Sequence, residues 1–329
     1  MTRKILLGIV VLLAIGLLFV FIWTRPSGDI DKYKEYFTDD LAPADTTHVK
    51  VSFFGVSTLL FDDGETQFLI DGFFSRFSLL TTLLSEIKSD TAGIDNIIAA
   101  HPMNRVKGIF VTHSHYDHAF DVAYTTKRTG ATLYGSLSTL NIARGGAVKE
   151  EQLSLFHPNE TVQLGKFRIT IIGSRHSPGK PLKEGVMTID EPLQQPAKMI
   201  DYAEGGAFDF LIEHEGKRIY VKPSPNYLEG ALDSLRADVL FIGIATITKQ
   251  TVEWQNAYYE QTVGKLKPTI VVPIHWDDFF HPISGDLVML PKFVSDNEKD
   301  FDFFISRTKA DRIDFKILQG TKSILLFKE

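Results

Sequence analysis

VTHSHYDH, residues 111–118, places three histidines and one carboxylate in its last six positions. The apolar run 108–111 leads directly into these residues and predicts a strand. Because side chains at positions i and i+2 of an extended segment share one face, His113 and His115 are expected to point into the same space. Imidazole and carboxylate groups together suit a borderline metal such as zinc. The segment therefore predicts a metal site at the end of a strand.

The spacing His113-x-His115-x-Asp117-His118 resembles the signature of the metallo-β-lactamase superfamily of hydrolases. The resemblance extends over most of the chain after about residue 48. It implies an α/β fold built as a four-layer αββα sandwich, with the metal site at one edge between the sheets. A weaker resemblance, to which Phe53-Phe54-Gly55 also contributes, is to the branch that contains N-acyl-phosphatidylethanolamine phospholipase D-like enzymes and sugar-lactone hydrolases.

The resemblance implies two sets of metal ligands. The first set is His113, His115 and His176, and the second set is Asp117, His118 and His275. His176 and His275 each lie just beyond an apolar run that predicts a strand, as His113 does. Three protein ligands that leave one position open to water are typical of catalytic zinc. Zinc is therefore the expected ion, one or two per chain, with manganese or iron as alternatives.

Further residues are expected to support this site or to compensate for a departure from the family pattern. Asp71 ends a predicted strand, and the resemblance assigns it a supporting role rather than a ligand role. Dinuclear members carry a bridging aspartate where this chain has the acid-free segment 220–226, so neutral Ser224 offers at best a weak ligand. A bridging hydroxide, Asp277 or Asp278 would have to compensate. His281 is a candidate proton donor in the pocket.

The expected chemistry follows from the effect of a metal on water. A bound divalent ion lowers the pKa of water towards about 7 and polarises a substrate oxygen, so hydroxide forms without a strong base. Asp117 is the candidate catalytic residue, because it can orient the hydroxide or accept its proton. The chain is expected to cleave an ester or a phosphodiester bond. A lactonase with the same mechanism, and a degenerate member that binds metal or ligand without turnover, are the alternatives.

The composition narrows the classes of partner. A net charge of −6 argues against nucleic-acid binding, which normally requires a basic surface. The chain has no cysteine, which excludes disulfides, thiolate ligands and a cysteine nucleophile. Two long connections, 72–105 and 177–207, are placed to form pocket walls, and the second carries apolar residues next to His176. A small-molecule or lipid-like substrate is therefore expected.

The N-terminus predicts a membrane anchor. Residues 5–23 contain no charge, and such a helix spans roughly 28 Å, close to the thickness of the hydrocarbon core of a bilayer. Arg3 and Lys4 precede this run, which favours a cytoplasmic N-terminus and an extracytoplasmic catalytic domain. A secreted protein with a cleaved signal peptide is the alternative. The expected organisation is an anchor at 1–27, a linker at 28–47 and the hydrolase domain at 48–329.

The remaining pattern predicts alternating strands and helices. Strands are predicted at 49–54, 57–61, 67–70, 131–134, 161–164, 167–172, 208–213, 218–221, 239–242 and 269–273. Helices are predicted at 77–87, 94–100, 119–128 and 253–266, and Gly130 is expected to cap the third of these in a left-handed conformation.

Overall fold

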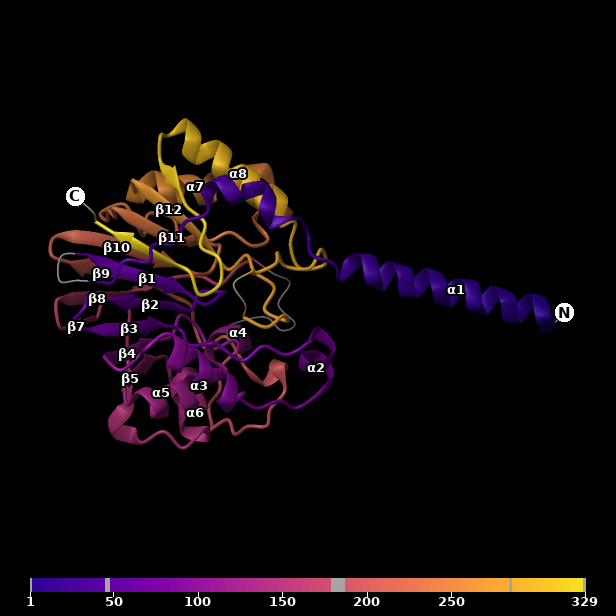
Figure 1. Cartoon of the computed structure of the whole chain (residues 1–329), viewed down its shortest axis with the longest axis horizontal. Coiled ribbons are helices and arrows are strands. Elements are labelled where there is room, and N and C mark those ends of the chain that lie inside the picture. Colours follow the sequence, from indigo (N-terminus) through magenta and orange to yellow (C-terminus); the bar gives the residue numbers. More distant parts are fainter. Residues whose placement is uncertain (1, 45–47, 179–186, 284–285, 328–329) are drawn as a thin grey trace.

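Two sheets packed face to face form the centre of the computed structural model (Figure 1). The structure describes residues 2–44, 48–178, 187–283 and 286–327, and within these residues each sheet has seven strands. The first sheet has the spatial order β14 (Ser323–Leu326), β1 (Val49–Phe53), β2 (Leu59–Asp62), β3 (Gln67–Ile70), β4 (Val106–Phe110), β5 (Thr132–Gly135) and β6 (Leu153–Leu155).

The second sheet repeats the same plan. Its order is β13 (Asp314–Phe315), β12 (Ile270–Ile274), β11 (Val239–Gly243), β10 (Lys217–Lys222), β9 (Phe208–His214), β8 (Phe167–Gly173) and β7 (Thr161–Leu164). The strands from β14 to β3 and from β7 to β10 pair antiparallel, whereas those from β3 to β6 and from β10 to β13 pair parallel. Parallel pairing brings the carboxyl ends of neighbouring strands to one edge, which is where loops can build a site.

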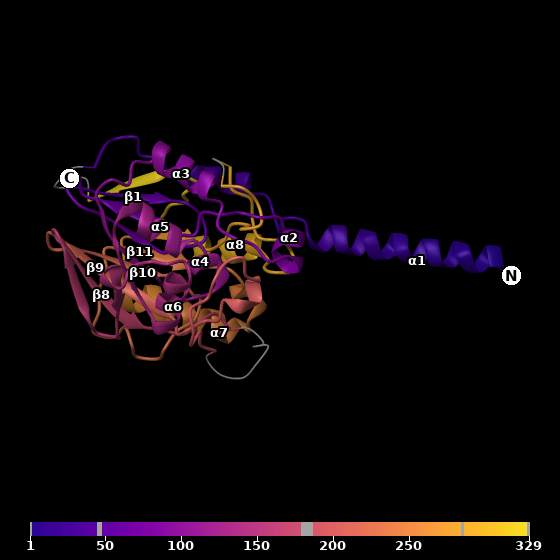
Figure 2. The same ribbon diagram turned by 90° about the horizontal axis from the view of Figure 1, so that it is seen from below.

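Helices cover the outer faces of the two sheets (Figures 1 and 2). The α-helices are α1 (Thr2–Trp23), α2 (Leu79–Leu84), α3 (Thr91–Ala100), α4 (Tyr116–Ala119), α5 (Val122–Thr129), α6 (Leu137–Gly145), α7 (Val252–Tyr259) and α8 (Asn297–Ala310). Short 3₁₀ segments are η1 (Ile30–Tyr36), η2 (Glu150–Gln152), η3 (Met199–Asp201) and η4 (Ile247–Lys249), and η5 (Glu260–Gly264) is π-helical. Helices α3, α5 and α6 lie on the side of the first sheet, and α7 and α8 on the side of the second.

The buried apolar side chains form two clusters that match these layers. One cluster joins the two sheets and includes Phe61, Phe241 and, from α8, Phe301. The other joins the first sheet to its helices and includes Ile109 and Leu140. Burial of side chains of this size contributes about 1.5–3 kcal/mol each relative to exposure, so the layered core stabilises the strand ends that carry the histidines.

The observed architecture confirms the predicted mixed α/β fold with two sheets flanked by helices. Several predicted boundaries were wrong. The predicted helix 77–87 is helical only over α2, and 119–128 is split into α4 and α5 because the chain leaves helical geometry at Asp121, while the predicted helix 253–266 continues as π-helix after Tyr259. Gly130 has φ 73°, which confirms the left-handed cap.

The N-terminal helix α1 projects away from the sandwich (Figure 1). Its segment Ile5–Trp23 has 19 residues and is long and apolar enough to cross a membrane, and a signal sequence would meet the same criteria. The residues after α1 bond to the body of the protein: Phe293 N donates to Trp23 O at 3.2 Å, and Ser27 N donates to Leu290 O at 2.8 Å. Tyr33, within the predicted linker, is buried in the core. The predicted domain boundaries at 27 and 47 stay a prediction.

Candidate metal centre

The predicted ligands come together at one end of the sandwich because each follows the carboxyl end of a strand. His113 lies three residues after β4, His176 three residues after β8, and His275 directly after β12. Both views show α4, which contains Asp117 and His118, beyond the strand ends on the side from which α1 projects (Figures 1 and 2). The structure thus brings together residues that are far apart in the sequence.

The first group consists of His113, His115 and His176. One ring nitrogen from each lies within 4.8 Å of the others, and the ring centroids are 4.6–4.8 Å apart. His113 Nε2 is buried and has no hydrogen-bond partner among the described residues. Burying a polar atom without a partner costs free energy, so this nitrogen is expected to bind a partner such as a metal ion.

The second group consists of Asp117, His118 and His275. The distances are 3.2 Å between the two Nε2 atoms, 3.3 Å from His275 Nε2 to Asp117 Oδ2, and 3.6 Å from His118 Nε2 to Asp117 Oδ2. Two ligand atoms that each lie about 2.0–2.2 Å from a tetrahedral ion are roughly 3.3–3.6 Å apart. The triangle therefore has the size that one divalent ion requires, and the residues fit the metal.

Asp71 orients the second group through a dense set of hydrogen bonds. Its carboxylate is fully buried and accepts from Ser57 Oγ at 2.5 Å and from Thr112 N at 2.8 Å, and it lies 2.8 Å from His118 Nδ1. Because His118 Nδ1–H points to Asp71, its Nε2 is left with a lone pair that faces the centre of the group. Sequence reasoning missed Ser57, which lies in a turn with no distinguishing motif.

The backbone around His275 is held in an unusual conformation. His275 has φ 57°, and its N–H donates to Val56 O at 2.6 Å. Val56 N in turn donates to Asp277 Oδ1 at 2.6 Å. A positive φ costs a non-glycine residue of order 1 kcal/mol and persists only where surrounding contacts enforce it. The loop around Val56 therefore fixes the position of His275.

The pKa values of the side chains shift in different directions in the two groups. Burial and the neighbouring imidazoles lower the pKa of His113 well below its usual value and lower the pKa of His176 to about 3. Burial also lowers the pKa of His118, but Asp117 and Asp71 outweigh it and raise that pKa. Burial raises the pKa of Asp117, yet His118 and His275 outweigh burial and hold it well below its ordinary range. The first group is thus neutral imidazole, and the second carries an ionised carboxylate.

Comparison with known proteins agrees with this geometry. A family model described as the Beta-lactamase superfamily domain matches residues 66–276, which is more than half of the chain. The chain belongs to the β-lactamase superfamily. It is 25% identical over 240 residues to a UPF0173 metal-dependent hydrolase of Heliobacterium modesticaldum, and the match covers 70% of this chain and 83% of the relative.

Two solved structures share the superfamily fold. A metallo hydrolase from Ignicoccus hospitalis superposes with a TM-score of 0.55 at 15% identity, covering 86% of this chain and 100% of the other. CmlA, a diiron beta-hydroxylase from Streptomyces venezuelae, superposes with a TM-score of 0.53 at 13% identity, covering 88% of this chain and 55% of the other. At these identities the two structures show a shared fold alone.

The segment in which a bridging aspartate was expected begins at the end of β10. Lys222 is buried there, and its Nζ lies 3.0 Å from Asp209 Oδ2 and donates to Ser174 Oγ at 3.1 Å. Ser224 follows and is also buried. Asn226 Nδ2 donates to His176 O at 2.6 Å, so this segment holds the loop that carries a predicted ligand. The buried acid beside Lys222, Asp209, is therefore paired with a lysine.

The other predicted acids have partners outside the two groups. Asp277 accepts from Val56, and its Oδ2 faces the buried guanidinium of Arg76 at 3.9 Å. Asp278 Oδ2 lies 2.8 Å from His281 Nδ1, and the His281 side chain is exposed. Among the described residues, neither acid belongs to a candidate ligand group. These contacts do not support a role for either acid in place of a bridging aspartate, and that role stays a prediction. The role of His281 as proton donor also stays a prediction.

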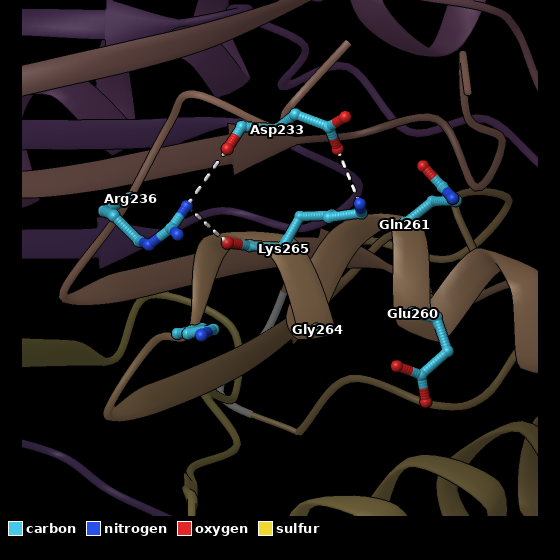
Figure 3. Close-up of a pocket in the computed structure, with 7 residues that line it drawn as sticks. Asp233, Arg236, Glu260, Gln261, Gly264 and Lys265 are labelled. Atoms are coloured by element: carbon cyan, nitrogen blue, oxygen red, sulfur yellow. Dashed lines mark hydrogen bonds and ion pairs between the residues drawn. The ribbon is translucent and has the colours of Figure 1, made fainter. Parts of the chain in front are cut away.

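A separate surface hollow contains none of the predicted ligands (Figure 3). It lies between the segment after β10 and η5, where Lys265 Nζ pairs with Asp233 Oδ1 at 2.6 Å and Arg236 NH1 donates to Lys265 O at 3.1 Å. Exposed pairs of this kind contribute little to stability. The predicted wall segment 177–207 lies partly outside the described residues, because the structure does not describe 179–186.

Proposed function

We propose that this member of the β-lactamase superfamily is a metal-dependent hydrolase that cleaves an ester or a phosphodiester bond. The observation that carries the proposal is the convergence of six ligand side chains into two adjacent groups of the size of a metal site. The rings of His113 and His118, one from each group, have centroids only 3.8 Å apart. Two adjacent ions are a common arrangement for displacement at phosphorus or at an acyl carbon.

The residues themselves have separate tasks in this proposal. Divalent ions held here supply Lewis acidity and a water acidic enough to attack near neutral pH. His113, His115 and His176 hold one ion as neutral donors, and Asp117, His118 and His275 hold the other. Asp117 stays ionised at all relevant pH values because its pKa is held low, so it can accept a hydrogen bond from the attacking water and orient it.

Zinc is the ion we propose for both positions. The donor set consists of imidazole nitrogens and one carboxylate oxygen, and the spacing in the second group matches tetrahedral coordination. Manganese and iron accept the same donors and are the alternatives. Metal analysis of the full chain, purified from cells grown without added metal, tests whether zinc is the bound ion.

Hydrolysis assays test the proposal directly. The full chain in detergent should hydrolyse bis(p-nitrophenyl) phosphate or p-nitrophenyl acetate, and a chelator should abolish the activity. His115→Ala should lose turnover and most metal while the protein stays folded. His157→Ala is the matched control, because the His157 side chain is exposed and its ring pairs with Glu160, outside the candidate metal centre. Full activity of His115→Ala would refute the assignment.

A member without catalytic activity is the second candidate, and the neutral Ser224 at the predicted bridging position favours it. A lactonase remains the alternative among catalytic members, in line with the weaker resemblance to sugar-lactone hydrolases. A panel of esters, phosphodiesters and lactones separates the three. Bound metal with no turnover on the whole panel would favour the member without catalytic activity.

We further propose that α1 is an uncleaved single span, with the N-terminus in the cytoplasm and the catalytic domain outside it. The apolar length of Ile5–Trp23 supports the span, and so does the end of this run, residues 19–23, which contains no Ala-x-Ala-like cleavage site. An amphiphilic substrate then becomes accessible from the membrane. Mass spectrometry of the mature N-terminus tests the proposal, since a chain that starts after Trp23 would identify a cleaved signal peptide.

A further inference from the structure

Helix α2 exposes three leucines on a single face. Leu80, Leu83 and Leu84 are 69%, 53% and 77% exposed, and they occupy positions i, i+3 and i+4 of the helix. Such positions lie on the same side of a helix. Thr82, in contrast, is buried, so the orientation of the helix is set by packing. We call Leu80, Leu83 and Leu84 the apolar tip.

A fourth exposed apolar residue lies on the segment beside α2. Ile87 and Ala197 exchange two backbone hydrogen bonds of 2.9 Å, which hold the segment after α2 against the segment that enters η3. Ile200, in η3, is 64% exposed. Isolated apolar residues on a surface are ordinary, but a helix face of three leucines with a further aliphatic residue nearby indicates an interaction surface.

The apolar tip lies at the end of the domain from which α1 projects. Both views show α2 at this end (Figures 1 and 2). The connection between α1 and the domain leaves little freedom, because Lys292 N donates to Arg25 O at 3.0 Å and Phe293 N donates to Trp23 O at 3.2 Å. If α1 spans a bilayer, the body of the protein begins within hydrogen-bond distance of the end of the span.

We propose that the apolar tip docks into the interfacial layer of the bilayer that α1 spans. The hydrogen bonds from Phe293 and Lys292 keep this end of the domain against the membrane, so the bilayer is the apolar phase that the leucines reach. Leucine side chains and short amphipathic segments bind at this depth through burial of apolar area. The docking surface and the span thus lie at the same end of the domain.

Docking has a consequence for substrate access. Helix α4, with Asp117 and His118, lies between the sheets and α2, on the side of the sheets from which α1 projects (Figures 1 and 2). A domain docked through the apolar tip therefore directs the candidate metal centre towards the membrane surface. This consequence rests on the proposed function, and it assigns as substrate class the head-group ester or phosphodiester of a membrane-embedded amphiphile. The docking itself does not depend on catalysis and is tested without it.

Lipid quenching of single fluorophores tests the docking. The chain has no cysteine, so Leu84→Cys, Leu41→Cys and Leu13→Cys each provide one labelling position. Leu41 is the matched control, because its side chain is 84% exposed. Its neighbour Ala42 accepts a hydrogen bond from Lys50 Nζ, and Lys50 lies in β1 opposite Leu325 of β14. That end of β14 lies away from α1 (Figures 1 and 2). Leu13 is in the middle of the predicted span.

The full chain is reconstituted into vesicles of phosphatidylcholine and phosphatidylglycerol that carry spin-labelled acyl chains. The label at Leu84→Cys should show a blue-shifted emission and lose fluorescence to the spin-labelled lipid, as should the label at Leu13→Cys. The label at Leu41→Cys should keep its emission in water and its intensity. This combination of results supports the docking.

Each other result overturns the proposal in an identifiable way. Quenching at Leu13→Cys without quenching at Leu84→Cys leaves the span intact and refutes the docking. A blue shift at Leu84→Cys without lipid quenching assigns the apolar tip to a protein partner instead. Equal quenching at Leu84→Cys and Leu41→Cys shows that the domain has no preferred face, and absence of quenching at Leu13→Cys refutes the membrane span on which the docking rests. Loss of hydrolytic activity would change none of these readings.

Discussion

Asp71→Asn should weaken metal binding at the second group without moving any ligand in the chain. Asp71 accepts hydrogen bonds from Ser57 Oγ and Thr112 N and lies 2.8 Å from His118 Nδ1. An asparagine has the same size but places either a donor or a neutral acceptor opposite His118. With a donor there, His118 Nδ1 must accept, the proton moves to Nε2, and Nε2 can no longer bind a metal.

The size of the effect follows from these contacts. Loss of a carboxylate that orients a ligand histidine typically costs 10–100-fold in metal affinity, which is about 1.4–2.7 kcal/mol. The fully buried position of Asp71 places the expected loss towards the upper end of that range, because no water can replace the acceptor. Asp71 reaches the first group only indirectly in the described part of the chain, through Thr112, whose Oγ1 donates to Asp71 and lies 3.3 Å from His113 Nδ1. The affinity of the first group should therefore change much less.

Chelator competition on the purified full chain measures both affinities, and denaturant titration measures folding. Asp63→Asn is the matched control, because Asp63 is also fully buried, accepts from Thr66 N at 2.7 Å and pairs with His214 Nε2 at 3.1 Å, outside the candidate centre. Both variants should lose stability of order 1–3 kcal/mol. Only Asp71→Asn should bind the ion of the second group more weakly than the unmodified chain does. Equal metal affinities in Asp71→Asn and the unmodified chain would refute the assigned role.

Further predictions concern single side chains. Ser224→Asp should tighten the second ion by adding a carboxylate, and unchanged metal stoichiometry in equilibrium dialysis would contradict this. His115→Ala should bind at least one ion fewer by elemental analysis. Burial raises the pKa of Asp300 from 3.8 to about 6, so the folded state favours its protonated form. The stability that this raised pKa contributes is complete below about pH 4 and is lost as the pH rises through about 6. An asparagine cannot ionise, so the free energy of unfolding of Asp300→Asn relative to that of the unmodified chain should rise by about 3 kcal/mol between those two pH values. Urea titrations at each pH measure this difference.

Most of the strands were predicted because apolar alternation and turn residues are visible within a short stretch of sequence. The hairpin of β7 and β8 was predicted within one residue, since apolar alternation and the turn at Gly165 lie within one short segment. Strand β14 was not predicted, although it pairs with β1 and closes the first sheet. Its partner is more than 250 positions away, and SILL is too short to be distinguished from a loop by periodicity. Helix α8 was missed because charged residues interrupt its apolar face.

The same distinction applies to the candidate site. The six predicted ligands share a property that sequence displays, which is a position just after a strand or at the start of the following helix. Residues that act through tertiary contacts display no such property. Ser57 reaches Asp71, and Lys222 pairs with Asp209 across neighbouring parts of a sheet, only after the chain has folded. In the sequence Lys222 is simply part of a segment without acid, whereas in the fold its buried charge explains why the buried Asp209 in β9 is tolerated.

The pKa shifts in the two groups predict which of the two ions is released first when the pH falls. Metal must displace any proton on a ligand nitrogen, so a ligand with a low pKa loses less affinity as the pH falls. Burial and neighbouring imidazoles keep His113 and His176 neutral down to low pH, with the pKa of His176 lowered to about 3. Burial lowers the pKa of His118, but Asp117 and Asp71 outweigh burial and raise it, so a proton competes for Nε2 at a higher pH than it does in the first group. The ion at the second group should therefore leave first as the pH falls, a pH profile of bound metal should show two steps, and a single step that releases both ions together would contradict the separation of the groups.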